Sequence, residues 1–138
     1  MRLNNILIIF WLTCTIESCG QIGHHNHKII NDMELSSIKN TIARQAIDAW
    51  QNGNIDAWNS LFTKEAKLYD DGNPRDLQKF SRECIGHERF ISIDKTEDNG
   101  LHVYGKFHSD TWGDFKTYFK FYLDSDNRIS RLEIGQAN

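Results

Sequence analysis

Two side chains in the middle of the chain have the chemistry of a proton-transfer site. Asp70 lies near the end of a stretch, residues 66–71, that alternates as a β-strand does. In that alternation Asp70 shares a face with Ala66 and Leu68, so we expect its carboxylate to point inward. Desolvation moves the pKa of a carboxylate toward that of a working base. Asp70 could equally accept hydrogen bonds and only hold a turn, and both interpretations stay open.

His87, directly after Gly86, is the second catalytic candidate, because imidazole titrates near neutral pH. It either acts at the mouth of a pocket or lies on the surface. Cys84 has no His or Asp placed to activate it, so we expect a buried, inert thiol.

Metal and cofactor chemistry have little support in the sequence. His24, His25 and His27 could chelate a metal, but no Cys or carboxylate stands at ligand spacing, so a solvated spacer is the favoured interpretation of the tract. The chain also has no glycine-rich phosphate loop and no Ser/His/Asp motif. We therefore expect no cofactor and no bound metal.

Composition describes one globular domain. The chain has 138 residues, of which 39% are hydrophobic, and a single proline. Sixteen basic against nineteen acidic residues give a net charge of −3, which leaves no cationic excess for a phosphate backbone. Nucleic acid is therefore not an expected partner.

The first nineteen residues have the pattern of a targeting segment. Arg2 precedes an eleven-residue apolar run, residues 6–16, which is shorter than the roughly 20 residues that span a bilayer. Ile16-Glu17-Ser18-Cys19 resembles the bacterial lipobox, although Glu17 departs from it. We expect residues 1–18 to be removed and Cys19 to carry lipid. Residues 19–32 then form a tether to the bacterial cell envelope. Secretion without lipid is the alternative.

Helix signals come first along the chain and strand signals follow, which indicates an α+β domain. We expect helices over residues 31–51, 55–62 and 74–84, and strands over 66–71, 90–96, 101–110, 115–123 and 128–135. Pairing Asp110 with Asp114 sets Val103 opposite Phe121 and Phe107 opposite Thr117 on an apolar face. The other face alternates Tyr and Lys, which suits either a homodimer contact or solvent.

Helices on one face of a bent antiparallel sheet leave a cone with an open mouth, where a pocket is expected. Ser109 and Thr117 are the hydroxyls on the apolar sheet face and could orient a polar atom of a ligand. Tyr69 and Trp112, near strand ends, could flank the opening.

The segments 43–71 and 119–136, with the helix closing in Asn-Gly-Asn-Ile-Asp and the hairpin Asp-x-Asp-Asn-Arg-Ile, resemble the NTF2-like superfamily. The likeness is to its SnoaL-like and ketosteroid-isomerase-like members, over residues 33–138. It implies three N-terminal helices on a bent antiparallel sheet. The superfamily includes isomerases, cyclases, dehydratases and carriers, so the fold does not set the activity.

Carrying the isomerase pattern over residue by residue places its general base on Asp70. Its two oxyanion donors fall on Ala46 and Phe119, which have no donor group. Each such donor is typically worth a few kcal/mol in the transition state, so this resemblance does not imply steroid-type isomerisation.

The function we expect is binding of a small, largely apolar molecule in the cone. The alternatives are an isomerase or lyase with Asp70 as base and a protein-interaction domain with a filled cone. The expected ligand-lining residues are Ala46, Trp50, Trp58, Tyr69, Phe107, Ser109, Thr117 and Phe119.

Overall fold

The computed structural model describes residues 30–138 of the chain. In this part the helices are α1 (Asp32–Ser36), α2 (Thr41–Gln51), α3 (Ile55–Ser60) and α4 (Leu77–Cys84). The strands are β1 (Phe62–Asp70), β2 (Asn73–Arg75), β3 (Glu88–Glu97), β4 (His102–Ser109), β5 (Gly113–Leu123) and β6 (Ile129–Gln136), and a 3₁₀ turn, η1, covers Asp98–Gly100. The expected signal segment, Cys19 and the tract His24, His25 and His27 lie outside the described residues.

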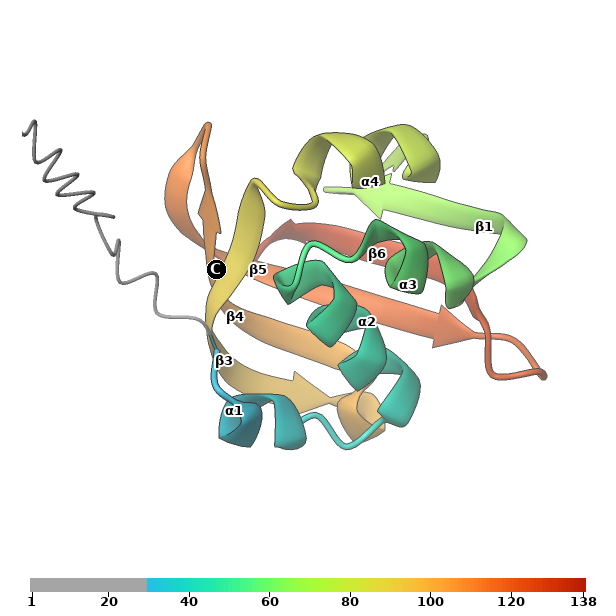
Figure 1. Cartoon of the computed structure of the whole chain (residues 1–138), viewed down its shortest axis with the longest axis horizontal. Helices are drawn as coiled ribbons and strands as arrows, with labels where there is room; N and C mark the ends of the chain where they lie inside the picture. Colours follow the sequence, from blue (N-terminus) through green and yellow to red (C-terminus); the bar gives the residue numbers. More distant parts are fainter. Residues whose placement is uncertain (1–29) are drawn as a thin grey trace, which may run out of the picture.

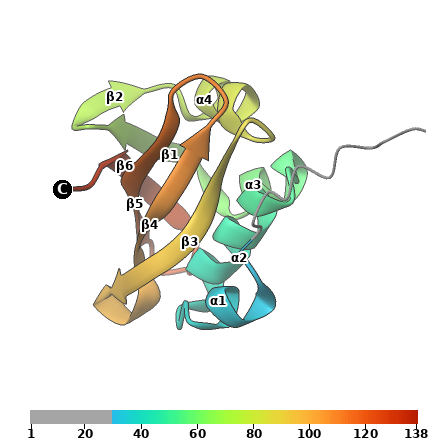
Figure 2. The ribbon, with the colours of Figure 1, turned by 90° about the vertical axis from the view of Figure 1, so that its left-hand side faces the viewer.

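The six strands form one sheet in the order β2-β1-β6-β5-β4-β3. Neighbouring strands are antiparallel except β1 and β6, which are parallel. Figures 1 and 2 show α1, α2 and α3 on one face of the sheet, with α4 at one end of that face. Register shifts in β3 and β6 bend the sheet around these helices. The expected α+β class is confirmed, and the parallel β1–β6 pair corrects the expected all-antiparallel sheet.

The first helix is shorter than predicted. A single helix over residues 31–51 was expected, but α1 and α2 are separate, each with its own cap. Asn31 and Glu34 form a capping box on α1, and the Asn40 side chain accepts from the Ala43 amide at 3.0 Å to open α2. Asn in a helix interior competes for backbone groups, and here it begins a new helix. Ile30, within the expected tether, is buried in the core.

The stretch around Pro74 forms a strand where we predicted the start of a helix. Asp71 and Gly72 have φ of 46° and 81°, the two positive values that a tight two-residue hairpin requires. The chain therefore folds back as β2, antiparallel to β1, with Pro74 on the sheet edge. The helix begins only at Leu77, capped by Asp76, whose carboxylate accepts from the Lys79 amide at 2.7 Å.

The β4–β5 hairpin keeps the predicted faces but shifts the predicted register by two residues. Ser109 pairs with Gly113, so Val103 lies opposite Phe119 and Phe107 opposite Phe115. The Ser109 hydroxyl accepts from the amides of Thr111 and Trp112, both at 3.3 Å, and so fixes a turn of the expected length one residue earlier in the chain. A shift of two leaves each side chain on its own face, because side chains alternate with a period of two.

Aromatic side chains fill the inner part of the cone. Trp50 meets Trp58 edge-on, with ring centroids 5.0 Å apart, and meets Phe119 at 5.3 Å. Both indole N–H groups are satisfied: Trp50 donates to the Glu88 carbonyl at 2.8 Å and Trp58 to the Ser81 hydroxyl at 2.9 Å. The deep interior is therefore solid, and any hollow must lie nearer the ends of the strands.

Candidate ligand-binding site

A cavity of about 450 Å³ opens between α4 and the inner face of the sheet. Its volume lies within the range of small-molecule pockets. It is lined by Asp70, Asp71, Arg75, Phe80, Glu88, Phe107, Trp112, Phe115, Thr117, Phe119, Ile134, Gly135 and Gln136. A filled cone, which the interaction-domain alternative requires, is not what the structure shows.

The walls of the cavity are largely aromatic. Phe107 and Phe119 are buried at its floor, and Phe115 contacts Phe107 edge-on at 5.7 Å between centroids. Phe80 of α4 closes the opposite side. Trp112, in the β4–β5 turn, stands at the rim with 79% of its surface exposed. These side chains make the walls of the cavity largely apolar, and the exposed Trp112 side chain lies at its mouth.

Asp70 lines the cavity, as its strand alternation predicted. Its Oδ2 accepts from Arg75 Nη1 at 2.8 Å, and 28% of the Asp70 side chain is exposed. Desolvation raises the pKa of Asp70 above its ordinary value, although the Arg75 charge opposes that rise. Arg75 comes from β2, the strand that was predicted as helix, so the sequence reasoning missed this partner.

Glu88 is the second carboxylate in the cavity and was also missed. Burial raises the pKa of Glu88, the neighbouring Ser109 and Cys84 side chains oppose that rise, and the negative charges of Asp70 and Asp110 add to it. The sequence did contain a pattern that indicates the inward position of Glu88. Glu88 is in phase with Phe90, which is fully buried, so extending the predicted strand back by two residues places Glu88 on the inner face.

Thr117 lines the cavity, but its hydroxyl is already committed. Its Oγ1 donates to the Gly135 carbonyl at 2.8 Å. Asp71 is committed as well, because its Oδ1 accepts from the Gln136 amide at 3.0 Å. These two residues fix the backbone at the end of β6 and leave Asp70, Arg75 and Glu88 as the charged groups able to meet a ligand.

Several predicted site residues lie elsewhere. Ala46, Trp50 and Trp58 are buried in the core and do not line the cavity. Tyr69 lies on the face of β1 opposite to Asp70, and Ser109 is buried and does not line the cavity. Alternation and burial predict that a side chain points inward, but they do not say whether it meets solid core or open space.

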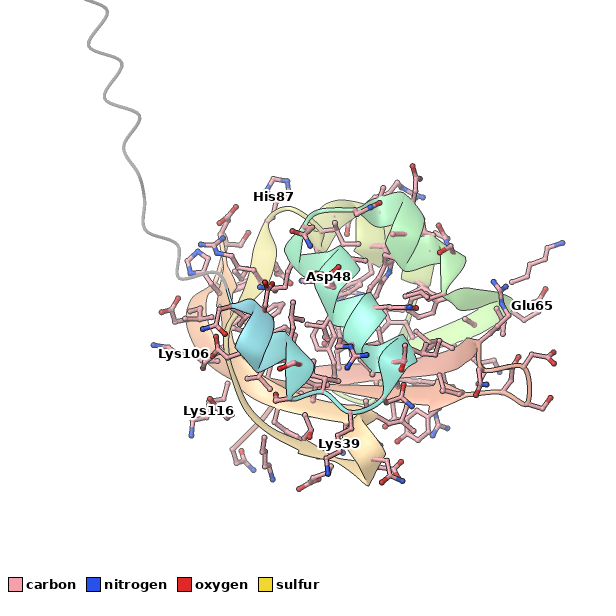
Figure 3. All side chains as sticks on the ribbon, turned by 60° about the horizontal axis from the view of Figure 1, so that its bottom comes forward. Lys39, Asp48, Glu65, His87, Lys106 and Lys116 are labelled. Atoms are coloured by element: carbon pink, nitrogen blue, oxygen red, sulfur yellow. The ribbon has the colours of Figure 1, made fainter. Side chains whose placement is uncertain are left out.

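His87 is not part of the cavity. Its side chain is 67% exposed, and its Nδ1 lies 3.3 Å from Asp110 Oδ2. Figure 3 shows it pointing outward from the loop between α4 and β3. Of the two interpretations of His87, a group at the mouth of the pocket or a surface residue, the structure therefore fits the second.

Cys84 was expected to be a buried, inert thiol, and the structure buries it only in part. It is half-buried, and desolvation together with the neighbouring Glu88 raises its pKa to about 12. Within residues 30–138 no group of three or more His, Cys, Asp or Glu side chains is arranged to hold a metal ion. No helix in that range is both long enough and apolar enough to cross a bilayer.

Comparisons with solved structures identify the fold. No protein-family model and no curated protein sequence matches the chain. An NTF2-like protein of unknown function from Cytophaga hutchinsonii superposes with a TM-score of 0.57 at 11% identity, over 70% of this chain and 87% of that one. A putative polyketide cyclase from Sinorhizobium meliloti gives 0.56 at 19% identity, over 69% and 94% of the two chains.

The orange carotenoid protein of Anabaena (Nostoc), solved binding canthaxanthin, gives a TM-score of 0.57 at 18% identity. The match covers 71% of this chain and 36% of that longer one. At these identities the comparisons establish the architecture alone, and activities remain properties of the individual proteins. The chain has the NTF2-like fold.

Proposed function

We propose that this domain binds a small, largely apolar molecule in the cavity between α4 and the sheet. The observation that carries the proposal is an open hollow of about 450 Å³ whose walls are phenylalanine rings and whose polar groups gather around Asp70 and Glu88. Such a combination of apolar walls and a few convergent polar groups is typical of small-molecule sites. The carotenoid-binding protein of the same fold supports the proposal by analogy.

The test is a fluorescence titration with Nile red, a neutral apolar dye that brightens in apolar surroundings. We expect saturable binding of one dye per chain. Phe115→Asp, which puts a charge into the apolar wall, should abolish the signal. Lys116→Asp changes the next residue of β5 on the outer face and is the matched control. Binding that survives Phe115→Asp, or its absence in the unaltered chain, would contradict the proposal.

Proton-transfer catalysis is a second candidate, favoured by one observation. Asp70 and Glu88 line the same cavity, and each has a pKa above its ordinary value. Such a pair could remove a proton beside the carbonyl of an apolar ketone and return it elsewhere. Deuterium exchange into 4-phenyl-2-butanone in D₂O, followed by NMR, tests this. Catalysed exchange that is lost in Glu88→Gln supports the enzyme, and exchange at the uncatalysed rate rules it out for this substrate class.

We further propose that Cys19 carries lipid and holds the domain at the bacterial cell envelope. The proposal is supported by the lipobox-like residues 16–19 after an apolar run. Mass spectrometry of the N-terminal peptide should find a diacylglyceryl group on Cys19. Cys19→Ala should move the protein to the soluble fraction, and an unmodified N-terminus would contradict the anchor.

A homodimer through the outer sheet face is the remaining proposal on partners. That face carries Tyr104, Tyr118 and Tyr122, and Figure 3 shows Lys106 and Lys116 projecting from the sheet. Cation–π contacts hold side chains in place on this face: Lys95 Nζ lies 4.5 Å from the Tyr104 ring centroid. Sedimentation should give a dimer mass that Tyr118→Asp reduces to a monomer, and a monomer in the unaltered chain would reject the contact.

A further inference from the structure

The charges around the cavity are unbalanced. Three carboxylates, Asp70, Asp71 and Glu88, line it, and Arg75 is the cation that lines it with them. Arg75 is engaged twice: it pairs with Asp70 at 2.8 Å, and its guanidinium carbon lies 5.7 Å from the centre of the Phe80 ring. Since this pair is neutral as a unit, the cavity keeps an excess of negative charge.

This excess leaves two carboxylates without a cation, and of these Asp71 already accepts a hydrogen bond from the Gln136 amide. Glu88 is the other one. The side chains of Ser109 and Cys84 beside it are uncharged, and the charges that bear on it, those of Asp70 and Asp110, are negative. Among residues 30–138 no lysine or arginine forms an ion pair with it. A half-buried carboxylate in this position gains from a cation supplied by a ligand.

The surrounding rings suit the same kind of group. Phe107, Phe115 and Trp112 share the cavity with Glu88, in addition to Phe80, whose ring already has the Arg75 guanidinium over it. The faces of aromatic rings attract cations through their quadrupole, and Trp does so most strongly. An ammonium group on a ligand would be attracted both by the carboxylate of Glu88 and by the aromatic rings. An anionic ligand would be repelled by Glu88, and a neutral ligand would gain neither attraction.

We infer that the ligand of this cavity is an amphipathic organic cation, with an ammonium group near Glu88 and an apolar, ring-containing body against Phe107, Phe115 and Phe119. The inference rests on the proposed function, since it names the chemical class that the same cavity would take. It excludes fatty acids and other lipophilic anions as the preferred ligands.

The experiment compares by calorimetry three probes that share a 4-phenylbutyl chain and differ in the head group. The first is 4-phenylbutyl-trimethylammonium, the second its uncharged isostere with carbon in place of nitrogen, and the third 5-phenylpentanoate. We expect the ammonium to bind at least about tenfold more tightly than the isostere, and the carboxylate most weakly. In Glu88→Gln that tenfold preference should shrink to within about threefold while the isostere keeps its affinity. Glu83→Gln is the control, because it makes the same substitution at an exposed position on helix α4. It should leave the preference intact.

A pH series on the unaltered chain gives a second readout that needs no variant. The trimethylammonium charge is permanent, so any pH dependence belongs to the protein. Because the carboxylate form of Glu88 binds the cation, the preference should fade as the pH drops through the raised pKa of Glu88. Asp70 and Asp110 are the other carboxylates that bear on Glu88, so the part of the fade that Glu88→Gln removes is the part that belongs to Glu88.

The outcomes separate the two claims. Equal binding of the ammonium and the isostere, or a preference that survives both Glu88→Gln and acid, overturns the inference and leaves the proposed apolar site standing. Failure of all three probes and of Nile red to bind overturns the proposed function and the inference with it.

Discussion

Asp70 and Glu88 face one cavity from strands near opposite edges of the sheet. Burial raises the pKa of Glu88, and the negative charge of Asp70 adds to that rise. The bend of the sheet brings β1 and β3 close enough for this interaction. Repulsion between two carboxylates in an otherwise aromatic cavity destabilises the fold. Destabilising arrangements of this kind are typical of functional sites.

Glu88→Gln should stabilise the fold at neutral pH. The folded-state pKa of Glu88 is raised above 4.5, so its protonated form is favoured by folding. That contribution is fully present below pH 4.5 and is lost as the pH rises through the folded-state pKa. We expect the free energy of unfolding at pH 7 to rise by up to about 1 kcal/mol, since the site keeps some solvent. Urea unfolding at pH 7 and pH 4 measures this, and a loss of stability at pH 7 would contradict it.

Asp70→Asn should lower the pKa of Glu88, because it removes the negative charge of Asp70 from the cavity. The free energy of unfolding should change by less than about 1 kcal/mol, since the lost ion pair with Arg75 is partly exposed. A ¹³C NMR titration of the Glu88 carboxyl measures the pKa, with Glu83→Gln as the control. An unchanged or higher pKa would show that the two carboxylates are not coupled.

Cys84 should resist alkylation in the folded chain. With its pKa raised to about 12 from 9.0, the thiolate fraction at neutral pH falls by about 1,000-fold. Iodoacetamide labelling followed by peptide mass spectrometry reports on Cys84 separately from the other cysteines. Glu88→Gln should speed the labelling, because Glu88 contributes to the raised pKa. Fast labelling in the unaltered chain would disprove the predicted environment.

Gly105→Ala should destabilise the fold by about 3 kcal/mol or more. A Cβ on Gly105 would collide with the carbonyl oxygen of Ser92 and touch the Phe90 ring, at the point where β3 bulges against β4. Gly53→Ala is the control: its Cβ would meet nothing within 4 Å, and its φ of +66° should cost about 1 kcal/mol. Thermal melts compare the two. Equal losses would mean that the close approach of β3 to β4 is not real.

The sequence alone was enough for the face assignments and for the inward position of Asp70. Alternation survives errors of register, so Phe107 and Thr117 were placed on the correct face although their predicted partners were two residues off. The turn at Asp71-Gly72 was read as leading into a helix capped by Asn73, and this hid both β2 and Arg75.

The extent of the cavity could not be predicted from the sequence. Trp50 and Phe107 follow the same inward pattern, yet the first packs into solid core and the second borders open space. That difference depends on where α4 lies over the sheet, which no local pattern encodes.

The most direct test of the account is to locate a bound apolar probe by intermolecular NMR contacts. With Nile red at saturation, we predict nuclear Overhauser effects from the dye to the rings of Phe80, Phe107 and Phe115 and to the Trp112 indole. Contacts to Tyr104 and Tyr118 on the outer face, or none to the cavity rings, would contradict the claim that this hollow is the binding site.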